Sequence, residues 1–255
     1  MSATDSSANG KPWPKHVISN VTQPPVSILT PTYNRRKFIP MLINCIKSQT
    51  YPKDHMEWVV LDDGTDSVFD LIEPHMKSMN INYIRSEEKL NVGVKRNRLH
   101  DAARGTILVN MDDDDYYMPE RVSHAVQTLV RNKAAICGAT CNHLYFNDDH
   151  SVWSCGPYNP NHATFGTMAY TKAYTKTHRC DETVTFAEEI EFTKKYSEPL
   201  KQLDPMKVML VICHKENTID KGKLRTPTNI HFRKTSLKLK NFVKSAELRT
   251  FYENV

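Results

Sequence analysis

The chain has 255 residues, of which 39% are hydrophobic and 25% charged, and its formal net charge is +5 at pH 7. This length and composition fit one large domain, or a domain and a half, with a real core and a well-charged surface. No stretch approaches the roughly 20 apolar residues of a membrane-spanning helix, and the N-terminus lacks the apolar core of a signal peptide, so we expect a soluble, cytoplasmic protein.

The positive charge is concentrated near the C-terminus. Residues 221–255 hold nine Lys and Arg against two Glu, a net charge of +7, which leaves −2 for the rest of the chain. We therefore expect no nucleic-acid partner for the main body. The six cysteines form no CxxC pair, and free thiols in a reducing compartment are the expected state.

The first half of the chain alternates between strand and helix patterns. Residues 1–24 are polar and contain several prolines, which predicts a disordered leader. Apolar runs then predict strands at 26–30, 58–61, 81–84 and 107–111, and helical spacing predicts helices near 38–51, 68–79, 92–105 and from 119 onward. This order predicts an α/β fold with an open, mostly parallel twisted sheet flanked by helices.

From about residue 134 the alternation weakens, which indicates a smaller region of mixed structure. Residues 134–144 resemble a strand broken at Gly138, and residues 153–167 have the composition of a binding loop. Residues 186–196 predict an amphipathic helix with Phe186, Ile190 and Tyr196 on its apolar side, and residues 208–212 predict a last strand.

The basic tail also carries an apolar helical pattern. The residues that follow this spacing are Leu239, Phe242, Val243 and Ala246. Such a helix can pack on the domain or lie on an anionic membrane surface. Both interpretations are open from the sequence, and packing is favoured.

Four consecutive aspartates, Asp112 to Asp115, follow the apolar run at 107–111. Carboxylates this close repel one another, and in a protein interior they are tolerated when a cation neutralises them. Hard oxygen ligands with no nearby Cys or His pattern favour Mg2+ or Mn2+ over zinc. The alternative is a solvated acidic turn.

Two other predicted strand ends carry unusual polar residues, at 31–34 and at 62–63. Ligands of open α/β sheets bind outside the carboxyl ends of the strands. We therefore expect the three strand ends to converge on one crevice, which favours the cation site over the solvated turn.

Five motifs lie in order between residues 25 and 217, namely VSILTPTYNR at 26–35, VVLDDGT at 59–65, GVKRN at 93–97, DDDD at 112–115 with Pro119, and EE at 188–189. Together they resemble the inverting family 2 glycosyltransferases of the GT-A fold. The resemblance implies a domain at 25–220, with a nucleotide-binding half at 25–120 and an acceptor-binding half at 121–220, followed by the basic helical tail at 221–255.

The family resemblance also implies an activity. A hexosyltransferase-like enzyme of this kind transfers a sugar from a UDP- or GDP-linked donor to a hydroxyl group of a glycan or another acceptor. It uses Mn2+ or Mg2+ and inverts the configuration of the sugar. The donor-side residues implied by the resemblance are Thr30, Pro31, Tyr33, Asp63, Arg96, Asp112 and Asp113.

Within this donor-side set the implied roles differ. Thr30, Pro31 and Tyr33 should line the nucleotide pocket, although Tyr33 is also explained as a packed aromatic. Asp63 should accept a hydrogen bond from the base, whereas Asp62 is a candidate structural cap. The resemblance also implies that Arg96 reaches the nucleotide or phosphate, while Lys95 is equally well explained as a solvated lysine.

The acidic run resembles the metal-binding Asp-x-Asp signature, with a register that four aspartates leave ambiguous. The favoured main ligand is Asp114, with Asp112 or Asp113 reaching the ribose or a metal-bound water, and Asp112 is also a candidate ligand. His214 resembles the late histidine of the family near the metal and diphosphate, with a structural role as the alternative.

The Glu188-Glu189 pair stands where the family places its acidic pair, facing the acceptor. Glu189 is the favoured general base, although the family usually has Asp there, and the longer side chain leaves open a transfer of the role to Glu188. The alternative is a pair of acids stabilised by a helix dipole. Residue type further suggests an acceptor loop that contains Trp153, His162 and Phe165.

Two rival functions are considered. A nucleotidyltransferase would share the sheet and the metal–carboxylate chemistry, but it would have a glycine-rich first loop with Arg or Lys, which residues 31–34 are not. A non-catalytic sugar-binding or scaffold module would retain the fold without needing all the acidic residues, and their presence at every expected place counts against it.

Overall fold

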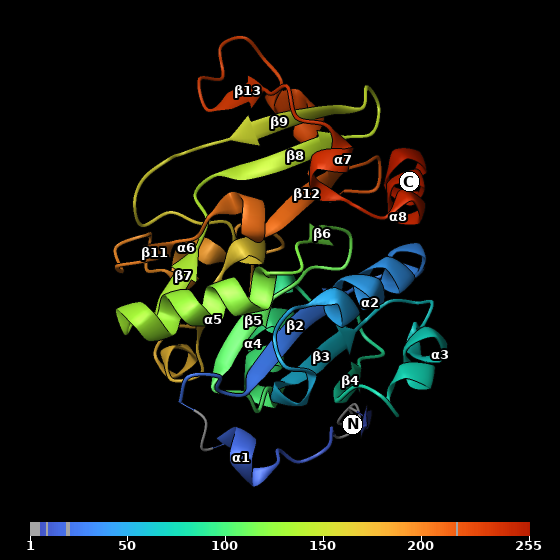
Figure 1. Cartoon of the computed structure of the whole chain (residues 1–255), viewed down its shortest axis with the longest axis vertical. Helices are drawn as coiled ribbons and strands as arrows, with labels where there is room; N and C mark the ends of the chain where they lie inside the picture. The colour runs from blue at the N-terminus through green and yellow to red at the C-terminus, as the bar shows by residue number, and fades with distance from the viewer. Residues whose placement is uncertain (1–5, 9, 19–20, 218) are drawn as a thin grey trace.

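The computed structural model describes residues 6–8, 10–18, 21–217 and 219–255. Within these residues the strands form two sheets (Figure 1). The larger sheet contains, in spatial order, β1 (Ser6–Ala8), β4 (Ile81–Arg85), β3 (Met56–Asp62), β2 (Val26–Thr32), β5 (Ile107–Asn110), β10 (Ala169–Thr171), β7 (Ile136–Gly138) and β11 (Lys201–Gln202). The smaller sheet contains β13 (Phe232–Lys234), β9 (Ser151–Cys155), β8 (Asn142–Phe146), β12 (Met209–Cys213) and β6 (Tyr116–Tyr117).

The centre of the larger sheet is parallel, which confirms the predicted fold class. Strand β2 pairs in parallel with both β3 and β5, and β3 pairs in parallel with β4. The antiparallel strands β1 and β10 lie outside this parallel block. The carboxyl ends of β2, β3 and β5 therefore meet at one edge of the sheet, as predicted.

Helices cover both faces of the parallel block, because its strands are apolar on both sides. On one face Ile28 and Val60 belong to the same core as Leu42 of α2 (Ile39–Ser48). On the other face Leu29 belongs to a second core with Leu99 of α4 (Val92–Ala102). The other α-helices are α1 (Lys15–Ile18), α3 (Phe69–Ile72), α5 (Arg121–Asn132), α6 (Glu189–Phe192), α7 (Leu239–Phe242) and α8 (Ala246–Asn254). Short 3-10 helices occupy Arg36–Phe38, Lys53–His55, Glu73–His75, Phe165–Thr167, Tyr174–Lys176, Pro205–Lys207 and Lys221–Leu224.

The predicted amphipathic helix at 186–196 is wrong in extent and orientation. Only α6 is α-helical, and the backbone at Ala187 and at residues 194–196 has positive φ angles, which end a right-handed helix. Phe186 and Ile190 are exposed, whereas Phe192 is fully buried. The core thus selects a different side of this segment from the one that its apolar spacing suggested.

The two ends of the chain also contain defined elements. In the predicted leader the structure describes β1 and α1, and residues 1–5, 9, 19 and 20 lie outside the described residues. In the tail, β13 joins the smaller sheet, and α7 and α8 replace a single helix. The apolar side chains of α7 are buried, as the packing interpretation predicts. Across the described residues, every helix is too short or too polar to cross a bilayer.

Candidate active site

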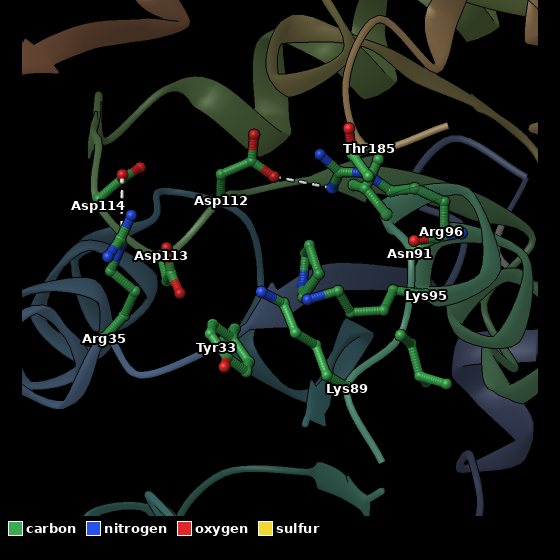
Figure 2. Close-up of a pocket in the computed structure, with 13 residues that line it drawn as sticks. Tyr33, Arg35, Lys89, Asn91, Lys95, Arg96, Asp112, Asp113, Asp114 and Thr185 are labelled. Carbon is green, nitrogen blue, oxygen red and sulfur yellow. Dashed lines mark ion pairs between the residues drawn. The ribbon is translucent and has the colours of Figure 1, made fainter. Parts of the chain in front are cut away.

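A cavity of about 330 Å³ lies at the carboxyl ends of β2 and β5, where the sequence predicts a crevice (Figure 2). It is lined by the end of β2 and the residues after it, by the start of α4 and the segment before it, by three aspartates and by one loop threonine. These residues are Pro31, Tyr33, Arg35, Lys89, Leu90, Asn91, Val92, Lys95, Arg96, Asp112, Asp113, Asp114 and Thr185. We call this space the donor cavity. Its lining combines one aromatic ring with several cations, a composition suited to a nucleotide diphosphate.

A second cavity of about 590 Å³ reaches from the donor cavity to the smaller sheet. We call it the acceptor cavity. The two share Val92, Arg96, Asp112, Asp114 and Thr185 in their linings. Glu188 and Glu189 line only the acceptor cavity. The predicted acidic pair and the aspartate run therefore face one continuous space.

Arg96 is buried at the junction of the two cavities and binds two carboxylates. Its Nη1 lies 2.7 Å from Oδ1 of Asp112, and its Nε donates to Oε1 of Glu188 at 3.0 Å. Its guanidinium also lies 4.6 Å from the ring centre of Phe165. Burial opposes the charged form of Arg96, but Asp112 and Glu188 outweigh it and raise its pKa well above the ordinary value. Arg96 lines the donor cavity, but its charge is committed to these two carboxylates, and its contact with the nucleotide stays a prediction.

Replacement of Arg96 by methionine should lower the free energy of unfolding by about 3 kcal/mol, because the buried Glu188 and the partly buried Asp112 would lose their cation. Chemical denaturation of both proteins measures the difference. Arg131 on α5 is exposed, so Arg131→Met should change the stability by less than about 0.5 kcal/mol. An unchanged stability of Arg96→Met would show that Arg96 does not hold this junction together.

The side chain of Asp114 lies among groups that stabilise its negative charge. Its Oδ2 is 3.4 Å from Nε2 of His214 and 3.7 Å from Nε of Arg35, and it accepts a hydrogen bond from Asn217 at 3.3 Å. Burial alone would raise the pKa of Asp114, but the hydrogen bond from His214 and the nearby charges of Lys221 and Arg35 hold it below the ordinary value. Asp114 is therefore an ionised carboxylate.

The neighbouring aspartates behave in the opposite way. Burial and the charge of Asp114 raise the pKa of Asp113 and of Asp115 well above the ordinary value. Asp115 accepts a hydrogen bond from the backbone N–H of Ile212 at 2.9 Å and does not line the donor cavity, whereas Asp113 does. In Figure 2 the side chains of Asp112, Asp113 and Asp114 point in different directions.

The donor atoms around Asp114 fit a divalent cation. Among the described residues, the one group that brings three potential ligand atoms within 4.8 Å of one another is His16, Asp54 and His55, near the amino end of β3 and away from this crevice. Beside the crevice, Oδ2 of Asp114 and Nε2 of His214 lie 3.4 Å apart, with the His214 side chain fully buried and in contact with Asn217. Mg2+ in phosphate-transfer sites is bound through one or two carboxylates together with substrate phosphates and waters, so this small set suits an ion that arrives with a diphosphate.

Glu188 and Glu189 differ in their surroundings. Glu188 is buried and ion-paired with Arg96. Burial and the charge of Glu188 raise the pKa of Glu189 to about 7. A carboxylate with a pKa near neutrality can take up a proton during a reaction at physiological pH, so the environment favours Glu189 over Glu188 as the base.

Two donor-side predictions are corrected. Thr30 is fully buried beneath the cavity, where its hydroxyl accepts a hydrogen bond from Trp58 at 2.9 Å and donates to the carbonyl of Met111 at 2.7 Å. It therefore holds β2 to its neighbours and does not line the nucleotide pocket. Lys95 is not solvated, because its ammonium lies 2.8 Å from Oδ1 of Asp63 in a buried ion pair.

The two aspartates at the carboxyl end of β3, Asp62 and Asp63, both have structural partners. Asp63 also accepts a hydrogen bond from the backbone of Leu90 at 2.7 Å, and its side chain has no exposed surface. Its predicted contact with a base therefore requires Lys95 or Leu90 to move. Asp62 accepts hydrogen bonds from the backbone N–H groups of Gly64 and Val68, which confirms the structural cap.

Of the three residues predicted on the acceptor side, two line the acceptor cavity and one does not. His162 and Phe165 line the acceptor cavity. Trp153 does not, because its ring packs 5.7 Å from the ring of Phe232 and its indole N–H donates to the hydroxyl of Ser151. The prediction that Trp153 stacks on a sugar is therefore corrected to a packing role within the smaller sheet.

Several residues of the site escape the sequence analysis. Arg35 is the last residue of the motif at 26–35, and Asn217 lies three residues after His214, so their positions near strand ends would have justified including them. The GVKRN motif has a second role, because Gly93 and Asn97 hold the loop that leads to Glu188. Asn97 exchanges two hydrogen bonds with the backbone of Cys180, and a Cβ on Gly93 would lie only 1.8 Å from the carbonyl of Asp181.

Comparisons with known proteins agree with this geometry. The family model described as glycosyl transferase family 2 matches residues 27–186. The putative teichuronic acid biosynthesis glycosyltransferase TuaG of Bacillus subtilis is 27% identical over 115 residues, which cover 44% of this chain and 45% of TuaG. The poly(ribitol-phosphate) beta-N-acetylglucosaminyltransferase TarS of Staphylococcus aureus is 33% identical over 101 residues, which cover 39% of this chain and 18% of TarS. The chain thus spans less than half the length of either relative.

Two solved structures share the fold. TarS 1–349 in complex with UDP-GlcNAc aligns with a TM-score of 0.60 at 22% identity, covering 73% of this chain and 58% of that one. The mannosyltransferase PcManGT of Pyrobaculum calidifontis, in complex with GDP-Man and Mn2+, aligns with a TM-score of 0.63 at 19% identity, covering 81% and 62%. These alignments confirm the predicted GT-A architecture. Because the family model covers more than half of its residues, the chain belongs to glycosyl transferase family 2.

Proposed function

We propose that the protein transfers a sugar from a nucleotide-diphosphate sugar to a hydroxyl group of an acceptor, with a divalent cation and with inversion of configuration. The observation that carries this proposal is the junction of the two cavities. The ionised Asp114 and Glu189, whose pKa is raised to about 7 by burial, line one continuous space, with Arg96 between their two sides. One side suits a departing diphosphate and the other suits a hydroxyl that must lose a proton.

The donor cavity supports a UDP- or GDP-linked sugar. The ammonium of Lys89 lies 4.4 Å from the ring centre of Tyr33, and Lys95 lies 5.6 Å from it. A base that stacked on Tyr33 would lie in the same cavity as Asp112, Asp113 and Asp114, which its phosphates could approach (Figure 2). The complexes of TarS with UDP-GlcNAc and of PcManGT with GDP-Man are consistent with either nucleotide.

A cation held by Asp114 and His214 would be Mn2+ or Mg2+, in keeping with the Mn2+ of the PcManGT complex. When bound, it would neutralise the negative charge on the leaving diphosphate. Arg35 lies beside the same carboxylate and would keep it ionised before the donor binds. Asp112, which is held by Arg96, is then free of the metal and can bind the ribose or a water.

Glu189 would act as the general base in a single displacement. Its carboxylate takes the proton of the acceptor hydroxyl, the hydroxyl oxygen forms a bond to the anomeric carbon, and the bond from that carbon to the diphosphate oxygen breaks. Attack from the face opposite the leaving group inverts the configuration. Glu188 would serve as a positioning residue through its ion pair with Arg96.

The rate should follow the ionisation of Glu189. Because burial raises its pKa to about 7, most molecules carry a protonated, inactive Glu189 below that pH and an ionised one above it. We expect kcat/KM to be about tenfold lower at pH 6 than on a plateau reached above pH 8. Initial rates in buffers of constant ionic strength measure this profile, and a flat profile between pH 6 and pH 8 would remove Glu189 as the base.

A panel of UDP- and GDP-sugars tests the proposed function. Incubation with Mn2+ should release nucleoside diphosphate from one donor, slowly with water and faster with an acceptor. Binding of a donor without any release would instead support a non-catalytic sugar-binding module. Release of pyrophosphate from a nucleoside triphosphate and a sugar phosphate would support a nucleotidyltransferase.

A further inference from the structure

The wall of the acceptor cavity that is formed by the smaller sheet is apolar. Apart from the polar Asn142 of β8, the side chains that β8, β12 and β13 contribute to it are Leu144, Met209, Val211 and Phe232. A wall of this kind offers a bound sugar ring few hydrogen-bonding groups. An apolar group that packs against this wall leaves water, which favours its binding.

The rim of the same cavity is apolar and exposed. Phe186 is 58% exposed, Ile219 50%, Tyr158 46% and Leu224 40%, and all four line the cavity. The described residues include nine large hydrophobic side chains that are this exposed, so nearly half of them gather at one cavity. Gathered apolar surface of this kind marks a binding site, whereas single exposed apolar residues do not.

Several polar groups of the lining are engaged in hydrogen bonds within the protein. The side-chain amide of Asn142 donates to the hydroxyl of Thr164 at 3.0 Å, Nδ1 of His162 lies 3.2 Å from the hydroxyl of Thr140, and the hydroxyl of Tyr158 lies 3.0 Å from Sγ of Cys155. These donors and acceptors are thus already paired, whereas the buried Oδ1 of Asn142 has no hydrogen-bond partner among the described residues. The carboxylates remain at the end of the cavity next to the donor.

We infer that the acceptor is amphipathic, and that it carries an alkyl chain or an aromatic ring beside the hydroxyl that receives the sugar. The hydroxyl would lie at Glu189. The apolar group would pack against the cavity wall that the smaller sheet forms, beneath Phe186, Ile219 and Leu224 at the rim. This inference rests on the proposed function, because it assumes that Glu189 faces the reacting hydroxyl.

The test uses a panel of hexoses as acceptors and compares the methyl, hexyl and phenyl glycosides of each hexose. The donor and Mn2+ are held constant. Release of nucleoside diphosphate above the rate without acceptor gives the acceptor KM. We expect KM to be about tenfold lower for the hexyl or the phenyl glycoside than for the methyl glycoside, because the added group leaves water on binding. A preference for hexyl alone identifies an alkyl chain, and a preference for phenyl alone identifies an aromatic ring.

Variants of the rim locate the effect. The double variant Ile219→Ser/Leu224→Ser should reduce the methyl-to-hexyl or methyl-to-phenyl ratio of KM to near one. The single variant Phe186→Ser, which lies on a separate loop, should reduce the same ratio. The matched control is Val130→Ser with Met206→Ser, two exposed apolar residues that do not line the cavity, and it should keep the ratio.

Three results separate this inference from the proposed function. Equal KM values for the three glycosides in the wild-type protein would overturn the inference while leaving the glycosyltransferase in place. A ratio that persists in both rim variants would also overturn it. No release of nucleoside diphosphate from any donor, with or without acceptor, would instead refute the function on which it rests.

Discussion

Glu189→Gln is expected to lower kcat by about 10³-fold, because glutamine cannot take the proton of the acceptor hydroxyl and general bases contribute factors of this order. The amide has nearly the shape of the carboxylate, so donor binding and thermal stability should be retained. Initial rates at saturating donor and acceptor measure the loss. The inflection of the pH–rate profile near pH 7 should disappear in the same variant, since the group responsible for it has been removed.

Glu191→Gln is the matched control, since Glu191 lies on the same short helix α6 and is exposed. It should keep at least about half of the wild-type rate. A Glu189→Gln protein that retained a rate within a few fold of wild type would contradict the assignment. If Glu188→Gln lost far more activity than Glu189→Gln, the role of base would pass to Glu188.

Asp114→Asn is expected to lower turnover at least about 100-fold and to raise the Mn2+ concentration needed for half-maximal rate. Asparagine keeps the shape of the side chain and its contact with Asn217, but it removes the charge beside His214 and Arg35. Rates measured across a Mn2+ titration separate loss of metal binding from loss of fold, because high metal should partly restore the activity of the variant.

Asp66→Asn serves as the control for removal of one surface charge, since Asp66 is exposed and pairs only weakly with Arg36 at 3.4 Å. Its Mn2+ requirement should match the wild type. His214→Ala should shift the Mn2+ requirement in the same direction as Asp114→Asn. An Asp114→Asn protein with an unchanged requirement would mean that the register of the acidic run is wrong and that another aspartate binds the cation.

The sequence was most informative where periodicity and strand ends coincide. Apolar runs located β2, β3, β4 and β5, and their order with intervening helices was enough to predict a parallel sheet. The convergence of Pro31, Tyr33 and Asp112 on one cavity then followed from the rule that parallel strands end at the same edge.

The orientation of single side chains was harder to predict. Thr30 lies two residues after Ile28 on β2, so the alternation of a strand places both on the same face, toward α2, and this signal was outweighed by the family motif. Lys95 could not be placed from local sequence, because its partner Asp63 is 32 residues away. The ion pairs of Arg96 with Asp112 and Glu188 depend in the same way on contacts that only the folded chain brings together.

The segment around Glu189 shows a further limit of prediction from sequence. Its apolar spacing predicted a helix that buries Phe186 and Ile190, but the second core takes Phe192 instead. The other two are exposed, and Phe186 lies at the rim of the acceptor cavity. Helical periodicity cannot tell a face that packs against the core from one that faces a substrate. The exposed Phe186 at the acceptor cavity supports the inferred amphipathic acceptor.

The most direct test of the central claim is the thermal stability of the protein with nucleoside diphosphates, in the presence and absence of Mn2+. Ligands that bind the folded state stabilise it by about 2.7 kcal/mol at a hundred times their Kd. We predict a rise in Tm with UDP or GDP that requires Mn2+ and is lost in Asp114→Asn. No rise with either nucleotide, or a rise that is independent of Mn2+ and kept in Asp114→Asn, would contradict a metal-dependent donor site in this cavity.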